Sequence, residues 1–376
     1  MTATPEPPHS VSFERMPFGT FDGKDVERIV LDNGTISVAL IAYGAAIQEL
    51  WVPDAEDDPA NIVLGFRDLA GFLGKNPHFG SILGRFANRI GNAQFPLDGE
   101  TVHITANKAP HSAHGGARPF DKYVWDAEVV ETEDGPGVRF THVSPDGDEG
   151  YPGTLTATVT YTLTPDDGLK LAYTATTDKP TVVNLTNHVY FNLNGESGGV
   201  VDEQIMQVFA SHFTPTDTAQ IPTGEIAPLD GNSLDFREPK RLGDVMRDAA
   251  NPQIAIARGI DHAFLLDRPD DADADPIAPI LAARLEDPFS GRVLEVLTTE
   301  PAVQIYTANS LDGSIAGYSD TLYRQSDAIC FETQHLPDSP NHPTFPSTVL
   351  RPGETFTSTT IYRFPPPVTT EMDDED

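Results

Sequence analysis

The chain has 376 residues, with 57 acidic against 24 basic side chains and a formal net charge of −33. Such a charge repels phosphate backbones and anionic lipid surfaces, so neither nucleic acid nor a membrane is expected as a partner. The single cysteine excludes an internal disulfide, and no stretch approaches the roughly 18 apolar residues of a membrane span. The first ten residues (MTATPEPPHS) lack the features of a signal peptide, so a cytoplasmic location is expected. The acidity fits either adaptation to high salt or an ordinary soluble acidic enzyme.

Short strands and frequent turns are predicted along the chain. A hairpin is predicted at Asp32-Asn33-Gly34. Residues 154–164 (TLTATVTYTLT) alternate apolar residues with threonines, and the same period resumes after a turn at 165–168. That pattern is typical of an antiparallel hairpin with one solvated face. A short helix is expected within 241–250.

The distribution of turn residues predicts the fold class and the domain limits. The 30 glycines and 33 prolines recur along the chain at intervals that indicate turns between short strands. We therefore expect an all-β fold, a large antiparallel sandwich with few short helices. It is expected to form a single domain over residues 13–365, with 1–12 and 366–376 as disordered tails.

Residues 181–194 (TVVNLTNHVYFNLN) are predicted to form one strand with two chemically different faces. Alternation places Asn184, Thr186, His188, Tyr190 and Asn192 on the same face. Amides, hydroxyls and an imidazole together suit the hydroxyl groups of a sugar. A solvent-facing strand with polar decoration is the competing interpretation.

Residues 330–341 (CFETQHLPDSPN) are predicted to form a buried strand that ends in a tight turn. Cys330, Glu332 and Gln334 then share one face. A carboxylate is costly to bury, so Glu332 in an apolar run indicates the floor of a polar cleft. An ordinary buried glutamate satisfied by hydrogen bonds is the alternative.

Other chemical patterns are weak. His111 and His114 lie three residues apart, but no third ligand follows at a metal spacing, and no metal or cofactor site is expected. Residues 195–199 (GESGG) match the spacing of a nucleophile elbow, but a helix is a poor expectation after them, so a glycine-rich turn is favoured.

A set of short motifs follows one another along nearly the whole chain, in the order 43–45 (YGA) through 52–54 (VPD), 61–66 (NIVLGF), 84–98 (GRFANRIGNAQFPLD), 114–116 (HGG), 120–122 (FDK), 186–188 (TNH), 190–193 (YFNL), 221–224 (IPTG), 259–262 (GIDH), 301–313 (PAVQIYTANSLDG), 332–335 (ETQH) and 350–354 (LRPGE). Taken together, these motifs resemble the aldose 1-epimerase (galactose mutarotase) family. The resemblance implies a β-supersandwich and cofactor-free interconversion of the α and β anomers of hexoses such as galactose and glucose. The expected partner is a monosaccharide, and the protein is expected to act as a monomer or homodimer.

The resemblance also implies roles for individual residues. Glu332 matches the family's general base and His188 its general acid. The expected substrate-binding residues are Asn88, Arg89, His114, Asp261 and Gln304. Two alternatives stay open: a sugar-binding module without turnover, and a glycosidase or lyase that uses Asp261 and Glu332 as a carboxylate pair.

Overall fold

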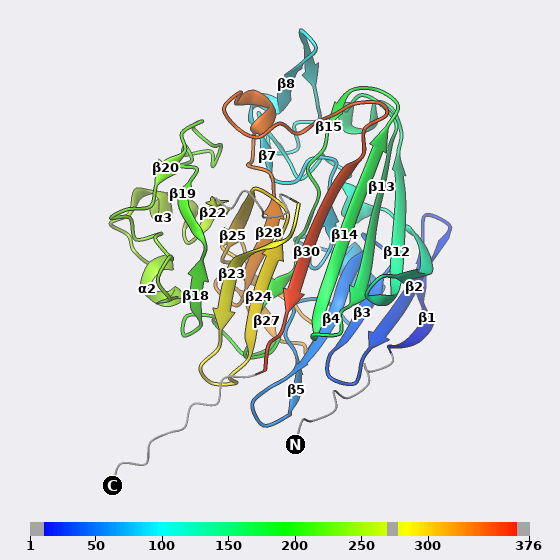
Figure 1. Ribbon diagram of the computed structural model, residues 1–376, viewed down its shortest axis with the longest axis vertical. Helices are drawn as coiled ribbons and strands as arrows, with labels where there is room; N and C mark the ends of the chain where they lie inside the picture. Colours follow the sequence, from blue (N-terminus) through cyan, green and yellow to red (C-terminus); the bar gives the residue numbers. More distant parts are fainter. Residues whose placement is uncertain (1–10, 269–276, 367–376) are drawn as a thin grey trace.

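The computed structural model describes residues 11–268 and 277–366 of the chain. Within these ranges nearly all regular structure is antiparallel β-sheet, as Figure 1 shows. The α-helices of the described residues are short, with bounds Leu69–Leu73 (α1), Leu242–Met246 (α2) and Pro252–Ala257 (α3). None of them is long and apolar enough to cross a membrane. The predicted all-β class is confirmed, while the predicted tails lie almost wholly outside the described residues.

Three large sheets organise the described part of the chain. The first has strand order β1-β2-β3-β4-β5, with bounds Ser12–Phe21, Lys24–Asp32, Ser37–Ile41, Ala46–Pro53 and Pro59–Asn61. The second has order β11-β12-β13-β14-β30-β24-β23-β18-β21, with bounds Asp126–Thr132, Gly135–Ser144, Leu155–Leu163, Gly168–Thr177, Phe356–Arg363, Val293–Thr298, Ile280–Glu286, Ile205–Val208 and Lys240–Arg241. The third has order β17-β28-β25-β22-β19-β20, with bounds Tyr190–Phe191, Ile329–Gln334, Ala302–Tyr306, Asp261–Leu266, Ala210–Phe213 and Ala227–Pro228.

The described residues also form two-stranded sheets. They are β6 (Ile82–Leu83) with β16 (Thr186–Asn187), β7 (Arg89–Ile90) with β10 (Ser112–Ala113), β8 (Gln94–Leu97) with β9 (Glu100–His103), β15 (Thr181–Val182) with β29 (Val349–Leu350), and β26 (Asp312–Ala316) with β27 (Leu322–Arg324). Turns of 3₁₀ helix cover Gly91–Ala93, Phe120–Lys122, Asp148–Gly150 and Ser339–Asn341.

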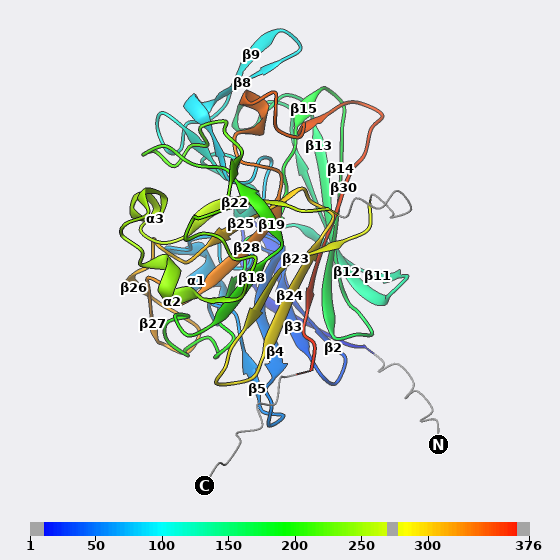
Figure 2. The same ribbon diagram turned by 60° about the vertical axis from the view of Figure 1, so that its left-hand side comes forward.

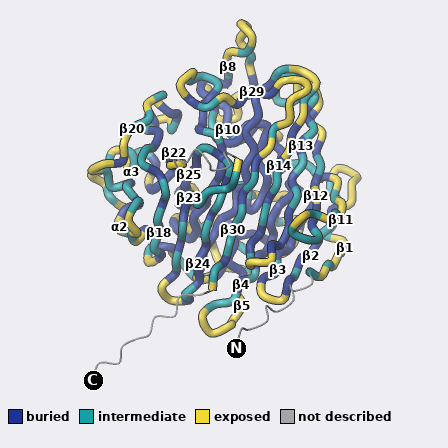
Figure 3. Tube along the Cα trace, viewed as in Figure 1, coloured by how far each residue is buried: buried dark blue, intermediate teal, exposed yellow. Residues whose placement is uncertain are grey.

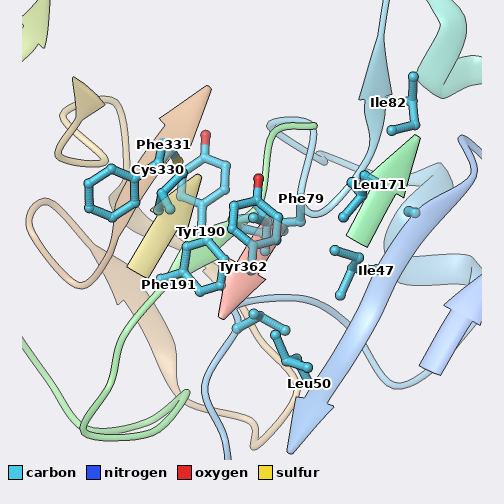
Figure 4. Close-up of a cluster of buried hydrophobic side chains, with 14 of the residues drawn as sticks. Ile47, Leu50, Phe79, Ile82, Leu171, Tyr190, Phe191, Cys330, Phe331 and Tyr362 are labelled. Carbon is cyan, nitrogen blue, oxygen red and sulfur yellow. The ribbon is translucent and has the colours of Figure 1, made fainter. Parts of the chain in front are cut away.

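The sheets pack on one another through a continuous apolar core. Figures 1 and 2 show the six-stranded sheet layered against the nine-stranded one, and Figure 3 shows the buried residues concentrated along the central strands. Phe191 of β17 meets Tyr362 of β30 with ring centroids 5.0 Å apart, and Phe331 of β28 packs beside them (Figure 4). Leu171 of β14 and Ile47 of β4 belong to the same buried cluster, so all three sheets share one core.

Both predicted hairpins are confirmed. In β13 and β14 the alternate apolar residues are buried, whereas Thr158 and Thr174 face outward and share a 2.7 Å hydrogen bond. The β2–β3 turn is closed by the side-chain oxygen of Asn33, which accepts hydrogen bonds from the backbone of Thr35 and Ile36. α2 lies inside the expected helical segment, while α1 and α3 were not predicted because helices of five or six residues leave almost no periodic pattern.

The prediction of one continuous strand over residues 181–194 is wrong. The segment forms three two-residue strands, β15, β16 and β17, which pair with β29, β6 and β28 in three different sheets. Its amides hold these crossings together, because Asn184 donates to the carbonyl of His335 at 3.3 Å and Asn187 to that of Gly80 at 2.6 Å. Asn192 likewise donates to the carbonyl of Asp327, so these amides are structural and do not form a sugar-facing row.

A buried guanidinium joins three separate segments of the fold. Arg292 donates to the carbonyls of Val52, Leu193 and Asp58 at 3.0, 3.0 and 2.8 Å, and its side chain is 4% exposed. The planar fork of arginine reaches several acceptors at once, which a lysine ammonium on a flexible stem does not reproduce.

We expect Arg292→Lys to lower the free energy of unfolding by about 2 kcal/mol or more, because buried carbonyls lose their donors. Urea unfolding followed by circular dichroism measures this. The matched control is Arg284→Lys, where the side chain is 31% exposed and pairs with Glu295, and a change below about 1 kcal/mol is expected. Equal losses in the two variants would contradict the assignment.

Candidate active site

Three neighbouring strands of the six-stranded sheet carry a row of polar side chains. Asp261 begins β22, Gln304 lies in the middle of β25, and Glu332 lies in the middle of β28. Gln304 stands directly opposite Glu332 in the register and donates through Nε2 to Oδ1 of Asp261 at 2.6 Å. The three strands are buried along almost their whole length, so the sheet places two carboxyl groups and an amide in a buried layer.

Asn88, Arg89 and His114 come from the β7–β10 pair. Arg89 stands opposite Ala113, so Asn88 before β7 and His114 after β10 face each other. The backbone N–H of His114 donates to the carbonyl of Asn88 at 2.8 Å, and the backbone N–H of Asn88 donates to Nδ1 of His114 at 3.2 Å. Since Nδ1 accepts a hydrogen bond, the proton of the neutral imidazole lies on Nε2.

Arg89 connects this pair of strands to the six-stranded sheet. Its guanidinium donates to Oδ2 of Asp261 at 3.2 Å and to Gln220 at 2.8 Å. Gln220 in turn donates to the same oxygen of Asp261 at 3.3 Å. Asp261 therefore accepts hydrogen bonds from three side chains, which keeps its carboxylate in one orientation.

His188 faces Glu332. Nε2 of His188 lies 3.5 Å from Oε1 of Glu332, and the two side chains are 5% and 2% exposed. The backbone of His188 is fixed from both sides, since it donates to the carbonyl of Ser81 at 2.8 Å and accepts from Gly80 at 3.0 Å. Its ring stacks on Tyr190 with centroids 5.0 Å apart. The imidazole is thus held rigidly against the carboxyl group.

All seven residues singled out from the sequence come together. The contacts run from Glu332 to His188, across a ring contact of 5.5 Å to His114, and on to Asn88. They continue through Arg89, Asp261 and Gln304 back to Glu332. Among residues 11–268 and 277–366 no set of three or more His, Cys, Asp or Glu side chains is arranged to hold a metal ion.

Sequence reasoning missed several residues of this site. Gln220 directly precedes the 221–224 motif but was not singled out, and its place between Arg89 and Asp261 depends on the fold. The ring of Tyr306 lies edge-on to the ring of His188, with centroids 6.0 Å apart. The ring of His78 also lies beside that of His188, with centroids 5.9 Å apart. Nothing in the local sequence around His78 indicated a site.

Three residues of the site have backbone φ angles in the left-handed region. The φ angles are +72° at His78, +60° at Asn88 and +54° at His114. Non-glycine residues adopt this region at a cost, and such residues gather at functional sites where the surrounding structure holds them. The backbone geometry supports the same location for the site as the side chains do.

Burial strongly favours the uncharged forms of the two central groups. Burial raises the pKa of Glu332 well above its usual value, and the nearby carboxylate of Asp261 adds to this while Arg89 opposes it. Burial, with a smaller contribution from the neighbouring His78, lowers the pKa of His188 to about 3. Burial also lowers the pKa of His114 well below its usual range. At a pH between these two pKa values, Glu332 and His188 together therefore hold one proton, which lies mainly on the carboxyl group.

We expect Glu332→Gln to stabilise the protein at about pH 8 and to have little effect below about pH 4. The folded-state pKa of Glu332 is raised, so ionisation of the carboxyl group opposes folding more and more as the pH rises above the unfolded value. A neutral amide of the same shape removes this cost. Thermal unfolding midpoints of the variant and the parent across this pH range measure it. A gain in midpoint that does not depend on pH would contradict the expectation.

Comparison with known proteins places the whole arrangement in one family. The family model described as aldose 1-epimerase matches residues 27–363. A human galactose mutarotase is 41% identical, over 94% of this chain and 97% of that protein. An aldose 1-epimerase of Escherichia coli K12 is 36% identical, over 91% of this chain and 96% of that protein. The crystal structure of a galactose 1-epimerase from Lactobacillus acidophilus NCFM superposes with a TM-score of 0.82 at 27% identity, covering 94% of this chain and 99% of that one. The chain belongs to the aldose 1-epimerase family.

Proposed function

We propose that this protein interconverts the α and β anomers of aldohexoses such as galactose and glucose. The observation that carries the proposal is the pair of His188 and Glu332, a rigidly held imidazole and carboxyl group 3.5 Å apart in a buried layer. Anomer exchange needs one group that takes a proton and one that gives a proton, and no nucleophile. The names of the relatives, galactose mutarotase and aldose 1-epimerase, agree with this chemistry.

In the proposed reaction Glu332 is the general base and His188 the general acid. Glu332 takes the proton of the anomeric hydroxyl while His188 gives a proton to the ring oxygen, and the bond between the anomeric carbon and the ring oxygen breaks. The open-chain aldehyde then rotates about its first carbon–carbon bond. Closure on the other face returns both protons, so the enzyme ends as it began.

The working form has an ionised Glu332 and a protonated His188. It differs from the neutral pair favoured by burial only in the position of one proton. Bound sugar hydroxyls that hydrogen-bond the carboxylate favour this ionised form, because hydrogen bonds to the charged form lower the pKa of a carboxyl group.

The remaining members of the contact circuit are proposed to bind and orient the sugar. Asp261 and Gln304 lie in the same layer as Glu332, where they offer acceptors and donors to hydroxyl groups. Asn88, Arg89 and His114 lie on the other side of the circuit, and Nε2–H of His114 is a neutral donor for a developing negative charge on oxygen.

The two alternative functions are less well supported. A binding module without turnover has no need of a buried acid–base pair, which costs stability. A glycosidase using Asp261 and Glu332 would need a free carboxylate at Asp261, but that group already accepts three hydrogen bonds. Gln304 on the intervening strand also separates the two carboxyl groups. Release of reducing ends from an oligosaccharide would favour the glycosidase.

Three further assignments accompany the proposal. The partner is a small monosaccharide, the acting species is a monomer or homodimer over a single domain of residues 13–365, and the location is the cytoplasm. The location is supported by Cys330, a buried thiol without a disulfide partner whose pKa burial raises, so the fold does not depend on an oxidising compartment.

We expect Glu332→Gln and His188→Asn each to lower kcat by about 10²–10⁴-fold, because each removes one of the two proton-transfer groups. Polarimetry of freshly dissolved α-galactose or α-glucose, corrected for spontaneous mutarotation, measures the rate. The matched controls are Glu128→Gln, whose side chain is 70% exposed, and the exposed His103→Asn, and both should keep the parent rate. A near-parent rate in either site variant would remove that residue from the mechanism.

We expect kcat/KM to pass through a maximum with pH. The rate falls on the acid side as the pair takes up a second proton at His188, whose pKa is about 3, and on the alkaline side as Glu332 loses the last proton at a pKa well above 4.5. Polarimetric rates at low substrate concentration across about pH 3 to pH 9 measure the profile. A flat profile over that range would contradict a carboxylate–imidazole pair.

A further inference from the structure

A third imidazole, that of His78, lies against both histidines of the site. Its ring centroid is 5.1 Å from that of His114 and 5.9 Å from that of His188, and the third side of this triangle measures 5.5 Å. The side chain of His78 is 25% exposed, compared with 5% for His188. The side chain of His78 is thus more exposed to solvent than that of His188.

A buried carboxylate fixes the ring of His78. Nδ1 of His78 lies 2.8 Å from Oδ2 of Asp121, whose side chain is 0% exposed, and Nζ of Lys122 lies 2.9 Å from the same oxygen. Burial opposes ionisation of Asp121, but His78 and Lys122 outweigh it and lower the pKa of the carboxyl group below its usual value. An ionised carboxylate only accepts hydrogen bonds, so Nδ1 of His78 carries the proton and donates a hydrogen bond to Asp121.

The turn that carries His78 is attached to the strand segment of His188. The hydroxyl of Tyr190 donates to the carbonyl of Pro77 at 3.0 Å, and the backbone pairs Gly80 with His188 and His188 with Ser81. His78 itself is held in the left-handed region at φ +72°. The ring of His78 therefore keeps a fixed position relative to the acid–base pair, as a group that positions a ligand must.

The two outer imidazoles have opposite hydrogen-bonding character. His114 accepts at Nδ1 from Asn88, so its free Nε2 is a donor. His78 donates at Nδ1 to Asp121, so its Nε2 is an acceptor in the neutral ring, and this atom has no hydrogen bond to any described residue. A hydroxyl group donates one hydrogen bond and accepts others, so a donor and an acceptor side by side suit a single sugar hydroxyl.

We propose that His78 is a further sugar-contacting residue, and a determinant of sugar preference, whose Nε2 accepts a hydrogen bond from one hydroxyl of the bound monosaccharide, with Asp121 as its positioning residue. The inference rests on the proposed function and adds a binding contact to it. It assigns the Asp121-His78 contact to substrate recognition and leaves the proton transfers to Glu332 and His188.

The first test replaces His78 with a ring that lacks the acceptor. His78→Phe is expected to raise KM roughly three- to tenfold, the effect of losing one hydrogen bond, with a smaller change in kcat. Initial rates of anomer exchange at varied sugar concentration give both constants, and His103→Phe, at an exposed position of β9, is the matched control. An unchanged KM would overturn the inference.

A panel of monodeoxy sugars identifies the hydroxyl. For the analogue that lacks the contacted hydroxyl, the parent and His78→Phe should have the same KM, while for every other analogue the variant keeps its defect. A defect of equal size on all analogues would mean that His78 acts on the shape of the site and not on a hydroxyl, which also overturns the inference. A parent enzyme that accelerates no sugar in the panel would instead overturn the proposed function.

The positioning role of Asp121 has its own test. Asp121→Leu removes the acceptor that holds the proton on Nδ1 of His78, so Nε2 is no longer fixed as an acceptor, whereas an asparagine oxygen at the position shared with Lys122 would still accept from Nδ1. KM should rise by no more than in His78→Phe, and the double variant should be no worse than His78→Phe alone. Lys122→Met removes the other partner of the carboxylate without changing the tautomer and should keep the parent KM. Additive defects would overturn the positioning role. Circular dichroism checks that each variant is folded, and His78→Phe with the deoxy panel decides the inference if Asp121→Leu does not fold.

Discussion

The site depends on keeping a carboxyl group and an imidazole in contact where water is nearly absent. Glu332 and His188 are 2% and 5% exposed, and each has a further side-chain atom without a hydrogen bond to the described residues. Burial of this kind opposes folding and suppresses charge on both groups. The surrounding structure must therefore supply enough packing to hold them, and the shared apolar core of the three sheets provides it.

Two kinds of structure position the chemical groups. The carboxyl groups and the amide of Gln304 come from adjacent strands, whose ladder hydrogen bonds fix their spacing. The imidazoles come from turns and strand ends, where tight backbone pairing replaces the ladder. Short irregular segments that are held at both ends by backbone hydrogen bonds leave these imidazoles little freedom to move.

Hydrogen bonds outside the His188–Glu332 pair decide which nitrogen of His114 and of His78 carries a proton. A backbone N–H sets the tautomer of His114, and a buried carboxylate sets that of His78. The arrangement gives neighbouring rings opposite polarity without any charge on His114, whose pKa burial lowers. Neutral groups of defined polarity suit an uncharged substrate, because they discriminate between hydroxyl positions without attracting ions.

The amino-acid sequence by itself determined the β class, the two hairpins, the buried strand around Glu332 and, through its motifs, the family, and it singled out the seven candidate site residues that the structure brings together. These features are local or collinear, so they survive in a one-dimensional pattern. Only the tertiary structure decided that residues 181–194 cross between three sheets, because the asparagines of that segment bond to carbonyls distant in the chain. It also decided the places of Gln220, His78 and Asp121, and the unusual proton affinities of Glu332 and His188. The strand crossings and these residue positions depend on pairing between segments distant in the chain, and the two pKa values depend on burial in the folded protein. The residues adjacent to each of them in sequence determine neither the pairing nor the burial.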